Sequence, residues 1–448
     1  MNFLSQVEAA GVAGCGGAGF PTHVKLAAQG VDTLIINGAE CEPLLRTDRW
    51  LMRNRANEMI LAIEAARQQL GANRAAIALK ESYIEEIAAL HTAIDNAELS
   101  IELFLLKGFY PAGDEHVQVF EVTGRVVPPG GIPLDVGCVA SNAATMYAIS
   151  NAVLGRPFTQ KYLTITGSVN SPCVVRAPIG TGFAELLALA GGACESNCIV
   201  VSGGPMMGKP MTMQEAMASH VTKTTSGYVI LPEGARLWQK HVTRPEFTLK
   251  QARTACVQCS FCTQLCPRRL LGHPIEPHKI MRRIGGNTNW REDLDNPVLR
   301  GAQYCCECGV CELIACPMEL RPRAVNVMVK QELAARGLRP LKGTGEYRPE
   351  EYRDERAIPT AKAAMRAGAG LWYKTEFDRF VEADPSEVHI ALNSHIGAPA
   401  VPVVQPGERV EFGQLIAKIP GGKLGVRYHA SIAGRVEEAG EYIEIMTQ

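Results

Sequence analysis

The run Cys256-x-x-Cys259-x-x-Cys262-x-x-x-Cys266-Pro267 and the run Cys305-x-x-Cys308-x-x-Cys311-x-x-x-x-Cys316-Pro317 lie within one short stretch of this chain. Each run supplies three cysteines in a tight turn and a fourth that is followed by proline. Loops with this spacing wrap [4Fe–4S] clusters, and in proteins with two such runs the fourth cysteine of each run ligates the other cluster. The sequence therefore predicts one cluster on Cys256, Cys259, Cys262 and Cys316. It predicts a second cluster on Cys305, Cys308, Cys311 and Cys266.

Structural zinc is the alternative reading of these cysteines. Zinc sites usually pair two separated C-x-x-C knuckles, whereas each run here has three cysteines followed by a Cys-Pro. The pattern therefore favours iron–sulfur clusters. Cys306 lies outside the register and is expected to be a spare thiol.

The length and composition indicate several folded domains. At 448 residues the chain exceeds a single core, so about three or four domains are expected. The 46% hydrophobic and 20% charged residues are typical of a globular protein. The formal net charge is −1 and no basic block is present, which argues against nucleic acid or an anionic membrane surface as a partner.

The cysteines and the absence of apolar runs predict a cytoplasmic location. Thiolate ligands need a reducing compartment, so disulfides are not expected among the cysteines of the two runs. Residues 1–10 lack the pattern of a signal peptide. No apolar stretch reaches the roughly eighteen residues that a membrane span needs.

A glycine-rich loop near the N-terminus suggests a phosphate site. Gly14, Gly16 and Gly19 match G-x-G-x-x-G, but the best predicted strand, residues 33–37, follows the loop. A Rossmann site needs the strand before the glycines, so that reading fails. Glycines still let backbone N–H groups approach a phosphate, and Lys25 could neutralise its charge.

Polar residues follow the predicted strand at its carboxyl end, where ligands bind in open α/β sheets. This segment, residues 37–43, reads Asn-Gly-Ala-Glu-Cys-Glu-Pro. Hydrophobic periodicity predicts helices over 54–70 and 81–93 and a short strand over 103–106. A turn with an aromatic residue and two carboxylates occupies 110–115, and a strand end with a helix is expected over 137–154.

Residues 14–154 resemble the flavin domain of the NADH-oxidising flavoprotein subunit of respiratory complex I, and resemble the RnfC component of the Rnf complex more closely. The resemblance rests on the motifs GGAGFPTHVK, NGAECEP, YPAGDE and SNAAT. It implies that FMN is bound by Gly14 and by residues from all four motifs, namely Gly16, Gly17, Lys25, Asn37, Tyr110, Ser141, Asn142 and Thr145.

The same resemblance implies NADH as the electron donor, stacked on the flavin near Glu40, Glu42, Asp114 and Glu115. Ionised carboxylates only accept hydrogen bonds, which suits ribose hydroxyl groups. They would repel the additional phosphate of NADP. Cys15 stands where the complex I loop usually has arginine. No protein side chain is expected to act as catalytic acid or base, because the chemistry takes place on the flavin.

The expected fold is multidomain, with α/β and α+β units. Later segments resemble a β-grasp module called SLBB and, in the all-β tail, a barrel-sandwich hybrid. The expected divisions are residues 1–155 (FMN and NADH), 156–212 (SLBB), 213–250 (linker), 251–335 (two [4Fe–4S] clusters, ferredoxin-like), 336–385 (connector) and 386–448 (barrel-sandwich hybrid).

The order of these modules resembles the cobalamin reductases of propanediol-utilisation microcompartments. The resemblance implies reduction of cob(III)alamin to cob(II)alamin and cob(I)alamin with NADH. It also implies a place inside a bacterial microcompartment, with a corrinoid adenosyltransferase and a shell protein as partners. The alternatives are an RnfC-type electron-transport protein that passes electrons to membrane partners, and a non-enzymatic scaffold that holds clusters.

Overall fold

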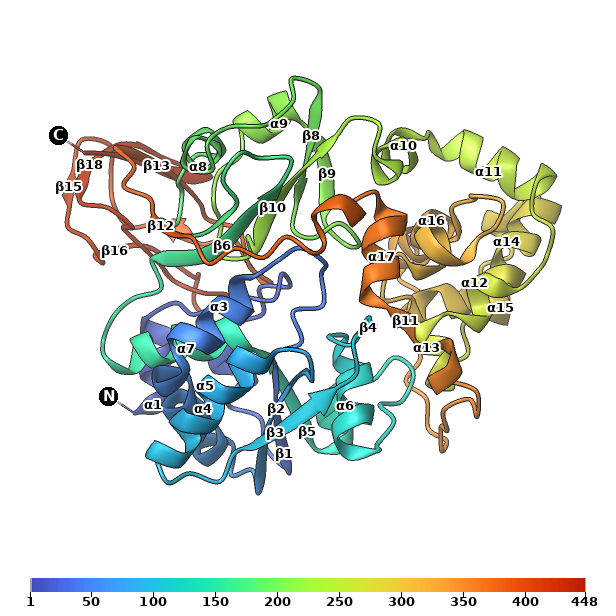
Figure 1. Cartoon of the computed structure of the whole chain (residues 1–448), viewed down its shortest axis with the longest axis horizontal. Helices are drawn as coiled ribbons and strands as arrows, with labels where there is room; N and C mark the ends of the chain where they lie inside the picture. Colours follow the sequence, from blue (N-terminus) through green and yellow to red (C-terminus); the bar gives the residue numbers. More distant parts are fainter. Residues whose placement is uncertain (1, 448) are drawn as a thin grey trace.

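The computed structural model describes residues 2–447. Its first unit is a parallel sheet of four strands in the order β3-β2-β1-β5, at the lower side of Figure 1. The strands are β1 (Thr33–Asn37), β2 (Arg74–Lys80), β3 (Glu102–Leu106) and β5 (Cys138–Asn142). Because the pairing is parallel, the carboxyl ends of β1 and β5 meet at one edge, where Asn37 is in register with Asn142.

Helices cover both faces of this sheet. Leu34 and Ile36 pack into one core, while Ile35 points into another, as the two-residue period of a strand requires. The first core is covered by α1 (Phe3–Ala9), α3 (Thr47–Asn54), α4 (Ala56–Leu70), α5 (Ile84–Asn96) and α7 (Ala143–Val153). The second is covered by α6 (Glu115–Thr123). Three short elements complete the unit, namely α2 (Thr22–Lys25), β4 (Phe109–Tyr110) and η1 (Pro133–Val136).

The second unit is a six-stranded sheet in the order β12-β7-β6-β10-β8-β9. Its strands are β6 (Gln160–Gly167), β7 (Cys173–Pro178), β8 (Cys198–Ser202), β9 (Lys209–Thr212), β10 (Gly227–Pro232) and β12 (Phe380–Glu382). Two helices, α8 (Phe183–Leu189) and α9 (Met213–Met217), accompany it.

Two segments of this sheet correct the sequence prediction. Residues 213–250 were expected to be a linker, but β10 lies inside the sheet between β6 and β8. Residues 336–385 were expected to be a connector, yet β12 adds to the edge beside β7. β10 is buried on both faces, so it shows no alternation of apolar and polar residues. β12 is only three residues long, too short to show a period.

The third unit is helical and carries the two cysteine runs. Its helices are α10 (Arg236–Val242), α11 (Pro245–Thr254), α12 (Phe261–Gln264), α13 (Pro267–Leu270), α14 (Pro277–Gly286), α15 (Pro297–Arg300) and α16 (Pro322–Ala335), with η2 (Trp290–Glu292), η3 (Gly301–Tyr304) and the π-helical turn η4 (Val310–Ala315). Several begin with proline, whose fixed φ suits the first turn. Ile280 and Ile284 of α14 pack with Val325 and Val329 of α16 in its core.

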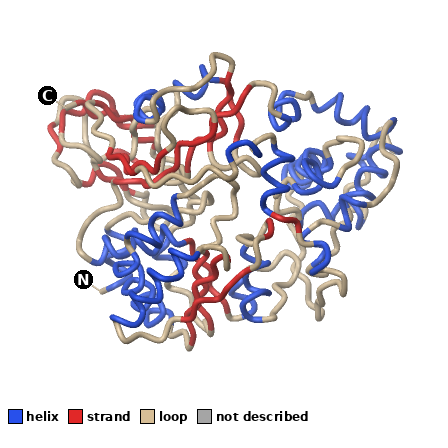
Figure 2. The backbone as a smooth tube through the Cα atoms, in the orientation of Figure 1, coloured by secondary structure: helices blue, strands red, loops and turns tan. Residues whose placement is uncertain are grey.

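The chain then returns across the molecule and ends in an all-β unit. The returning segment contains η5 (Asp354–Arg356), β11 (Ile358–Pro359), α17 (Thr360–Ala367) and η6 (Gly370–Trp372), and β11 pairs with β4. The predicted all-β character of the tail is confirmed, and its strands are β13 (Glu387–Ala391), β14 (Val401–Pro402), β15 (Arg409–Val410), β16 (Leu415–Lys418), β17 (Tyr428–His429), β18 (Gly434–Ala439) and β19 (Tyr442–Met446). They form two small sheets, visible beside the C-terminus in Figure 2.

A buried lysine joins three of the units. The Nζ of Lys223, from the β-grasp segment, donates to the carbonyl oxygen of Gly11 at 2.6 Å and of Arg427 at 2.8 Å. Gly11 follows α1 and has φ +69°, and a Cβ there would lie 2.3 Å from the Arg427 carbonyl oxygen. The tail therefore packs directly on the N-terminal segment. Both chain ends lie on the same side of the molecule in Figure 1.

Among the described residues, no helix has the length and apolar character needed to cross a membrane.

Candidate functional site

The glycine loop and the carboxyl edge of the first sheet enclose a cavity of about 180 Å³. Eight of the residues implied for FMN or NADH line it, namely Gly14, Gly16, Lys25, Asn37, Glu115, Ser141, Asn142 and Thr145. The cavity is also lined by residues that the sequence analysis did not assign to FMN or NADH, namely Ala18, Gly19, Phe20, Thr22, Gly113, Gln118 and Ala140. Most of these residues belong to the motifs GGAGFPTHVK and YPAGDE, so the motifs already indicated where the cavity lining would come from. Gln118 lies one helical turn beyond Asp114 on α6 and could have been found only by placing that helix.

Hydrogen bonds fix the glycine loop against α7. The N–H of Cys15 donates to Thr145 Oγ1 at 2.9 Å, and the N–H of Gly14 donates to the Phe20 carbonyl at 2.9 Å. The Asn142 side chain caps α7 by accepting from Ala144 N–H at 3.0 Å. Any Cβ at position 16 would lie 3.4 Å from the Asn142 Cβ and would narrow the cavity. The loop therefore presents backbone, rather than side chains, to the cavity.

The polar groups of the cavity fit an anionic, hydrogen-bonding ligand. Lys25 Nζ donates to the Ala140 carbonyl at 2.9 Å, and burial lowers the Lys25 pKa while Glu115 opposes the shift. Thr22 Oγ1 and Gln118 Oε1 are buried and have no hydrogen-bond partner among the described residues. Buried polar atoms are rarely left unpaired in a folded protein, so a bound ligand is expected to supply the hydrogen-bond partners that these two atoms lack. A phosphate and the polar edge of a flavin ring meet that requirement.

Two of the implied carboxylates shape the wall and do not line the cavity. Glu40 accepts from the N–H groups of Asp48 at 3.0 Å and Arg49 at 3.4 Å, at the start of α3. Glu42 accepts from the N–H groups of Met206 and Met207, both at 2.9 Å, and so ties this segment to the β-grasp unit. Burial raises the pKa of each to about 7.

Three more implied residues also lie outside the cavity lining. Gly17 has φ +98° and turns the loop without facing the cavity. Asp114 caps α6, accepting from His116 N–H at 3.0 Å, and pairs with Arg268 at 2.9 Å. The Tyr110 hydroxyl donates to the Cys308 carbonyl at 2.8 Å. Tyr110 and Asp114 therefore reach toward the cysteine runs.

The structure gathers the eight predicted cysteines into two sets. One small cavity is lined by Cys256, Cys259, Cys262 and Cys316, and another by Cys266, Cys305, Cys308 and Cys311. Each set thus takes its fourth sulfur from the other run. Protein donors approach the sulfurs, including Leu320 N–H to Cys316 Sγ at 3.3 Å and Glu307 N–H to Cys305 Sγ at 3.4 Å. Four convergent thiols with amide donors fit a [4Fe–4S] cluster.

Cys306 also lines the second cysteine cavity, beside the Arg268 guanidinium. It was expected to be a spare thiol, and the structure places it as a wall residue of this cavity.

The cavity beside the glycine loop is called the flavin-type cavity from here on. One segment, residues 110–115, connects it to the second cysteine cavity. Gly113 and Glu115 line the first cavity, and Tyr110 bonds to Cys308, which lines the second. Asp114 pairs with Arg268, the residue after the lining residue Pro267. The Asp114–Arg268 pair is almost fully buried, with side chains 12% and 9% exposed. Arg268 follows the Cys266-Pro267 pair. The first cysteine cavity has no such contact among the described residues, so the second is the one next to the sheet.

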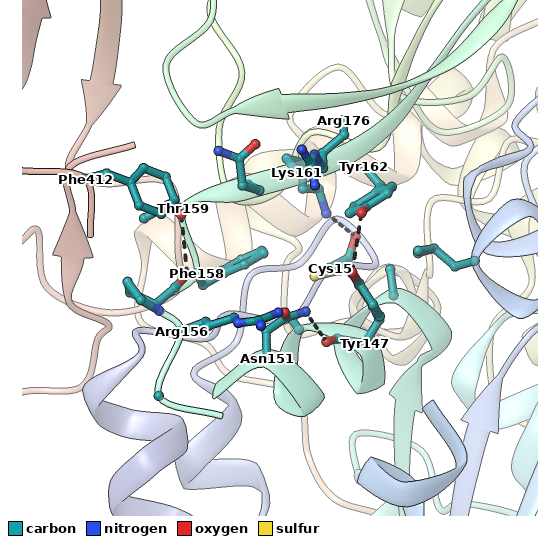
Figure 3. Close-up of a pocket in the computed structure, with 16 residues that line it drawn as sticks. Cys15, Tyr147, Asn151, Arg156, Phe158, Thr159, Lys161, Tyr162, Arg176 and Phe412 are labelled. Atoms are coloured by element: carbon teal, nitrogen blue, oxygen red, sulfur yellow. Dashed lines mark hydrogen bonds between the residues drawn. The ribbon is translucent and has the colours of Figure 1, made fainter. Parts of the chain in front are cut away.

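A larger cavity of about 310 Å³ lies on the other side of the glycine loop, where the first, β-grasp and tail units meet. Figure 3 shows Tyr147 and Asn151 of α7 facing Lys161 and Tyr162 of β6, while Phe412 of the tail lies at the opposite end of the cavity, near Thr159. The buried Lys161 donates its Nζ to the Cys15 carbonyl at 3.3 Å. Lys161 therefore supports the glycine loop from behind.

Four family models match the chain, each over one part of it. They are the Nuo51 FMN-binding domain over residues 7–151, the SLBB domain over 162–210, the 4Fe-4S dicluster domain over 255–321, and the RnfC barrel sandwich hybrid domain over 381–447. These matches confirm the predicted fold class and the predicted FMN and [4Fe–4S] cofactors. They decide against structural zinc and against a scaffold without a flavin domain.

Full-length relatives identify the family. A component of the Na(+)-translocating ferredoxin:NAD(+) oxidoreductase complex from Acetobacterium woodii is 34% identical, but over 58% of this chain and 56% of its own. Cobalamin reductase PduS from Salmonella typhimurium is 41% identical over 97% of this chain and 94% of its own, and the Citrobacter freundii protein of that name is 40% identical over the same shares. The chain belongs to the PduS cobalamin reductase family.

Proposed function

We propose that this protein is an NADH-dependent cobalamin reductase that passes electrons from FMN through two [4Fe–4S] clusters to cob(III)alamin and then to cob(II)alamin. The observation that carries the proposal is the segment 110–115, which lines the flavin-type cavity and contacts the second cysteine cavity. The full-length similarity to proteins named cobalamin reductase supports the choice of acceptor. Bound FMN would convert a two-electron hydride donor into single electrons, which cobalt chemistry requires.

The residues of the cavity hold and orient the cofactor. The backbone N–H of Gly16 and the ammonium of Lys25 would bind the FMN phosphate, while the Gly14 N–H, which donates to the Phe20 carbonyl, holds the loop in shape. Asn37 is held by bonds to Gly113 and Gln118, so its position at the cavity floor is fixed. Ser141, Asn142 and Thr145 close the far side.

The NADH contacts are divided between direct and supporting roles. Glu115 lines the cavity and can accept a hydrogen bond from a ribose hydroxyl group. Glu40, Glu42 and Asp114 already accept bonds from protein donors. We assign these three to holding the wall on the NADH side.

We further propose that the protein works inside a bacterial microcompartment with a corrinoid adenosyltransferase and a shell protein. The support is the resemblance of the module order to the reductases of propanediol-utilisation microcompartments. Co-sedimentation of tagged protein with purified microcompartments tests this placement. Recovery with membrane proteins of an Rnf-type complex instead would favour the Rnf-type alternative.

Anaerobic spectroscopy tests the proposed activity. NADH added to protein reconstituted with FMN and clusters is expected to bleach both the flavin and the cluster absorption, and cob(III)alamin added next is expected to restore it while cob(II)alamin forms. If NADH bleaches the protein but cobalamin stays oxidised, the acceptor is wrong. If NADH leaves the flavin oxidised, the donor is wrong.

A further inference from the structure

The two cysteine loops repeat one backbone conformation. Gln258 and Glu307, each two residues after the first cysteine, have φ +55° and +61°. Ser260 and Gly309, each one residue after the second cysteine, have φ +62° and +79°. The same positions of the two loops can therefore be compared: Val257 with Cys306, Phe261 with Val310, and Met318 with Arg268.

Around the second cysteine cavity these positions are covered. Val310 is fully buried, in a core that includes Tyr110 of the first unit and Met206 of the β-grasp unit. Arg268 is 8% exposed and is bound to Asp114. Cys308 is buried as well. The cover is supplied by the units that form and adjoin the flavin-type cavity, which is the side from which electrons arrive in the proposed function.

Around the first cysteine cavity the side chains at the equivalent positions are apolar and exposed to solvent. Val257 is 59% exposed, Phe261 45% and Met318 43%, and Cys259 is exposed where Cys308 is buried. Val257 and Met318 line the cysteine cavity itself. We call the surface formed by Val257, Phe261, Met318 and Cys259 the Cys259 face. No part of the described chain covers this face as the first unit covers its counterpart.

No lysine, arginine, aspartate or glutamate among the described residues lines the first cysteine cavity. Gln258 and Ser260, which alternate with its residues, are uncharged and also line the cavity. Glu319 follows Met318, and its carboxylate pairs with Arg236 at 3.1 Å. A neutral, methyl-bearing ligand fits such a surface better than a charged one, because burying an unpaired charge there would be costly.

We propose that the Cys259 face is where cobalamin docks to receive electrons from the first cluster. This inference rests on the proposed function. The corrin ring carries methyl groups and neutral carboxamides, which match three apolar side chains beside two uncharged polar ones. A protein acceptor would need about 800 Å² on each partner, and three side chains do not supply such an area.

The electron balance of this step is complete. Each NADH gives NAD⁺, one H⁺ and two electrons. The two electrons reduce two cob(III)alamin to cob(II)alamin, or one cob(III)alamin to cob(I)alamin. No further reductant is needed.

Stopped-flow measurements on variants of the Cys259 face test the proposal. The variant F261E adds charge to the face at a residue that does not line the cysteine cavity, and it leaves every cysteine in place. Protein pre-reduced with NADH is expected to reoxidise with cobalamin at a half-saturating concentration raised roughly tenfold or more, since apolar burial of this size and a buried charge oppose docking. The rate at which NADH bleaches the flavin and the clusters is expected to stay unchanged.

Leu371→Glu is the matched control, because Leu371 is apolar, 86% exposed and not part of the face. Iron content and the EPR signal of the reduced clusters check that each variant is intact. An unchanged cobalamin dependence in F261E with intact clusters overturns the proposal. A defect that is seen only when cobalamin is bound to another protein, and not with free cobalamin, overturns it too. If the unmodified protein fails to reduce cobalamin, the proposed function is wrong instead.

Discussion

At the scale of single residues, the cavity beside the glycine loop depends on one cation. Lys25 is the only lysine or arginine that lines it among the described residues. A charge-assisted hydrogen bond contributes about 1.5–3 kcal/mol, so Lys25→Met is expected to weaken FMN binding by roughly tenfold or more. Flavin fluorescence after denaturation of purified protein measures the retained FMN. Lys25→Arg keeps the charge and should retain more FMN, and full retention by the Met variant would contradict the role.

Glu42 predicts a pH dependence of stability. The folded protein keeps the Glu42 proton up to a pKa of about 7, whereas the ordinary value is 4.5. Folding therefore takes up a proton between these values, and the free energy of unfolding falls as pH rises through this window. Glu42→Gln should remove this fall, so the change in its free energy of unfolding between pH 5 and pH 8 should be smaller than that of the parent by about 2 kcal/mol. Its stability at pH 5 is expected to be lower than that of the parent, because the glutamine side chain has one acceptor oxygen for the two N–H groups. Thermal unfolding at both pH values checks this, and parallel pH profiles would contradict it.

At the scale of elements, Gly167 shows how β6 and β10 pack. Gly167 has φ +92°, and a Cβ there would lie 2.0 Å from the Ile230 carbonyl oxygen. Gly167→Ala is therefore expected to lower the free energy of unfolding by at least about 2 kcal/mol, from strain and overpacking together. Gly234→Ala is the control, since no atom lies within 4 Å of its added Cβ. Thermal unfolding that is equal in the two variants would argue against this packing.

The elements also show what the sequence could predict. The tail strands and the helices of the first unit were predictable because turns and periodicity are local signals. The cysteine spacing even predicted the exchange of Cys266 and Cys316 between the two sets, since that exchange follows from the loop itself. β10 and β12 were missed because their place in the sheet is decided by neighbours distant in the chain. The bonds of Glu42 to Met206 and of Tyr110 to Cys308 were missed for the same reason, because a motif does not reveal which domain packs against it.

At the scale of the whole molecule, the order of the cofactors predicts two different defects. Cys266→Ser removes a proposed ligand of the second cluster, the one next to the flavin, so NADH should still bleach the flavin while the first cluster stays oxidised. Cys316→Ser removes a ligand of the outer cluster, so the second cluster should still be reduced. EPR after NADH addition distinguishes the variants. Equal reduction of the remaining cluster in both would contradict the order, and iron content shows that each variant keeps one cluster.

The contact of Lys223 with Gly11 and Arg427 also bears on the ancestry of this architecture. Lys223, from the middle of the chain, links the C-terminal barrel to the N-terminal unit by two hydrogen bonds. Both chain ends lie on the same side of the molecule in Figure 1. A gene circularly permuted so that the barrel is translated first would still encode all three residues of that contact, because the contact does not depend on the order in which its parts are translated. The barrel could therefore stand at either end of the chain in related proteins while the folded arrangement of the units stays the same.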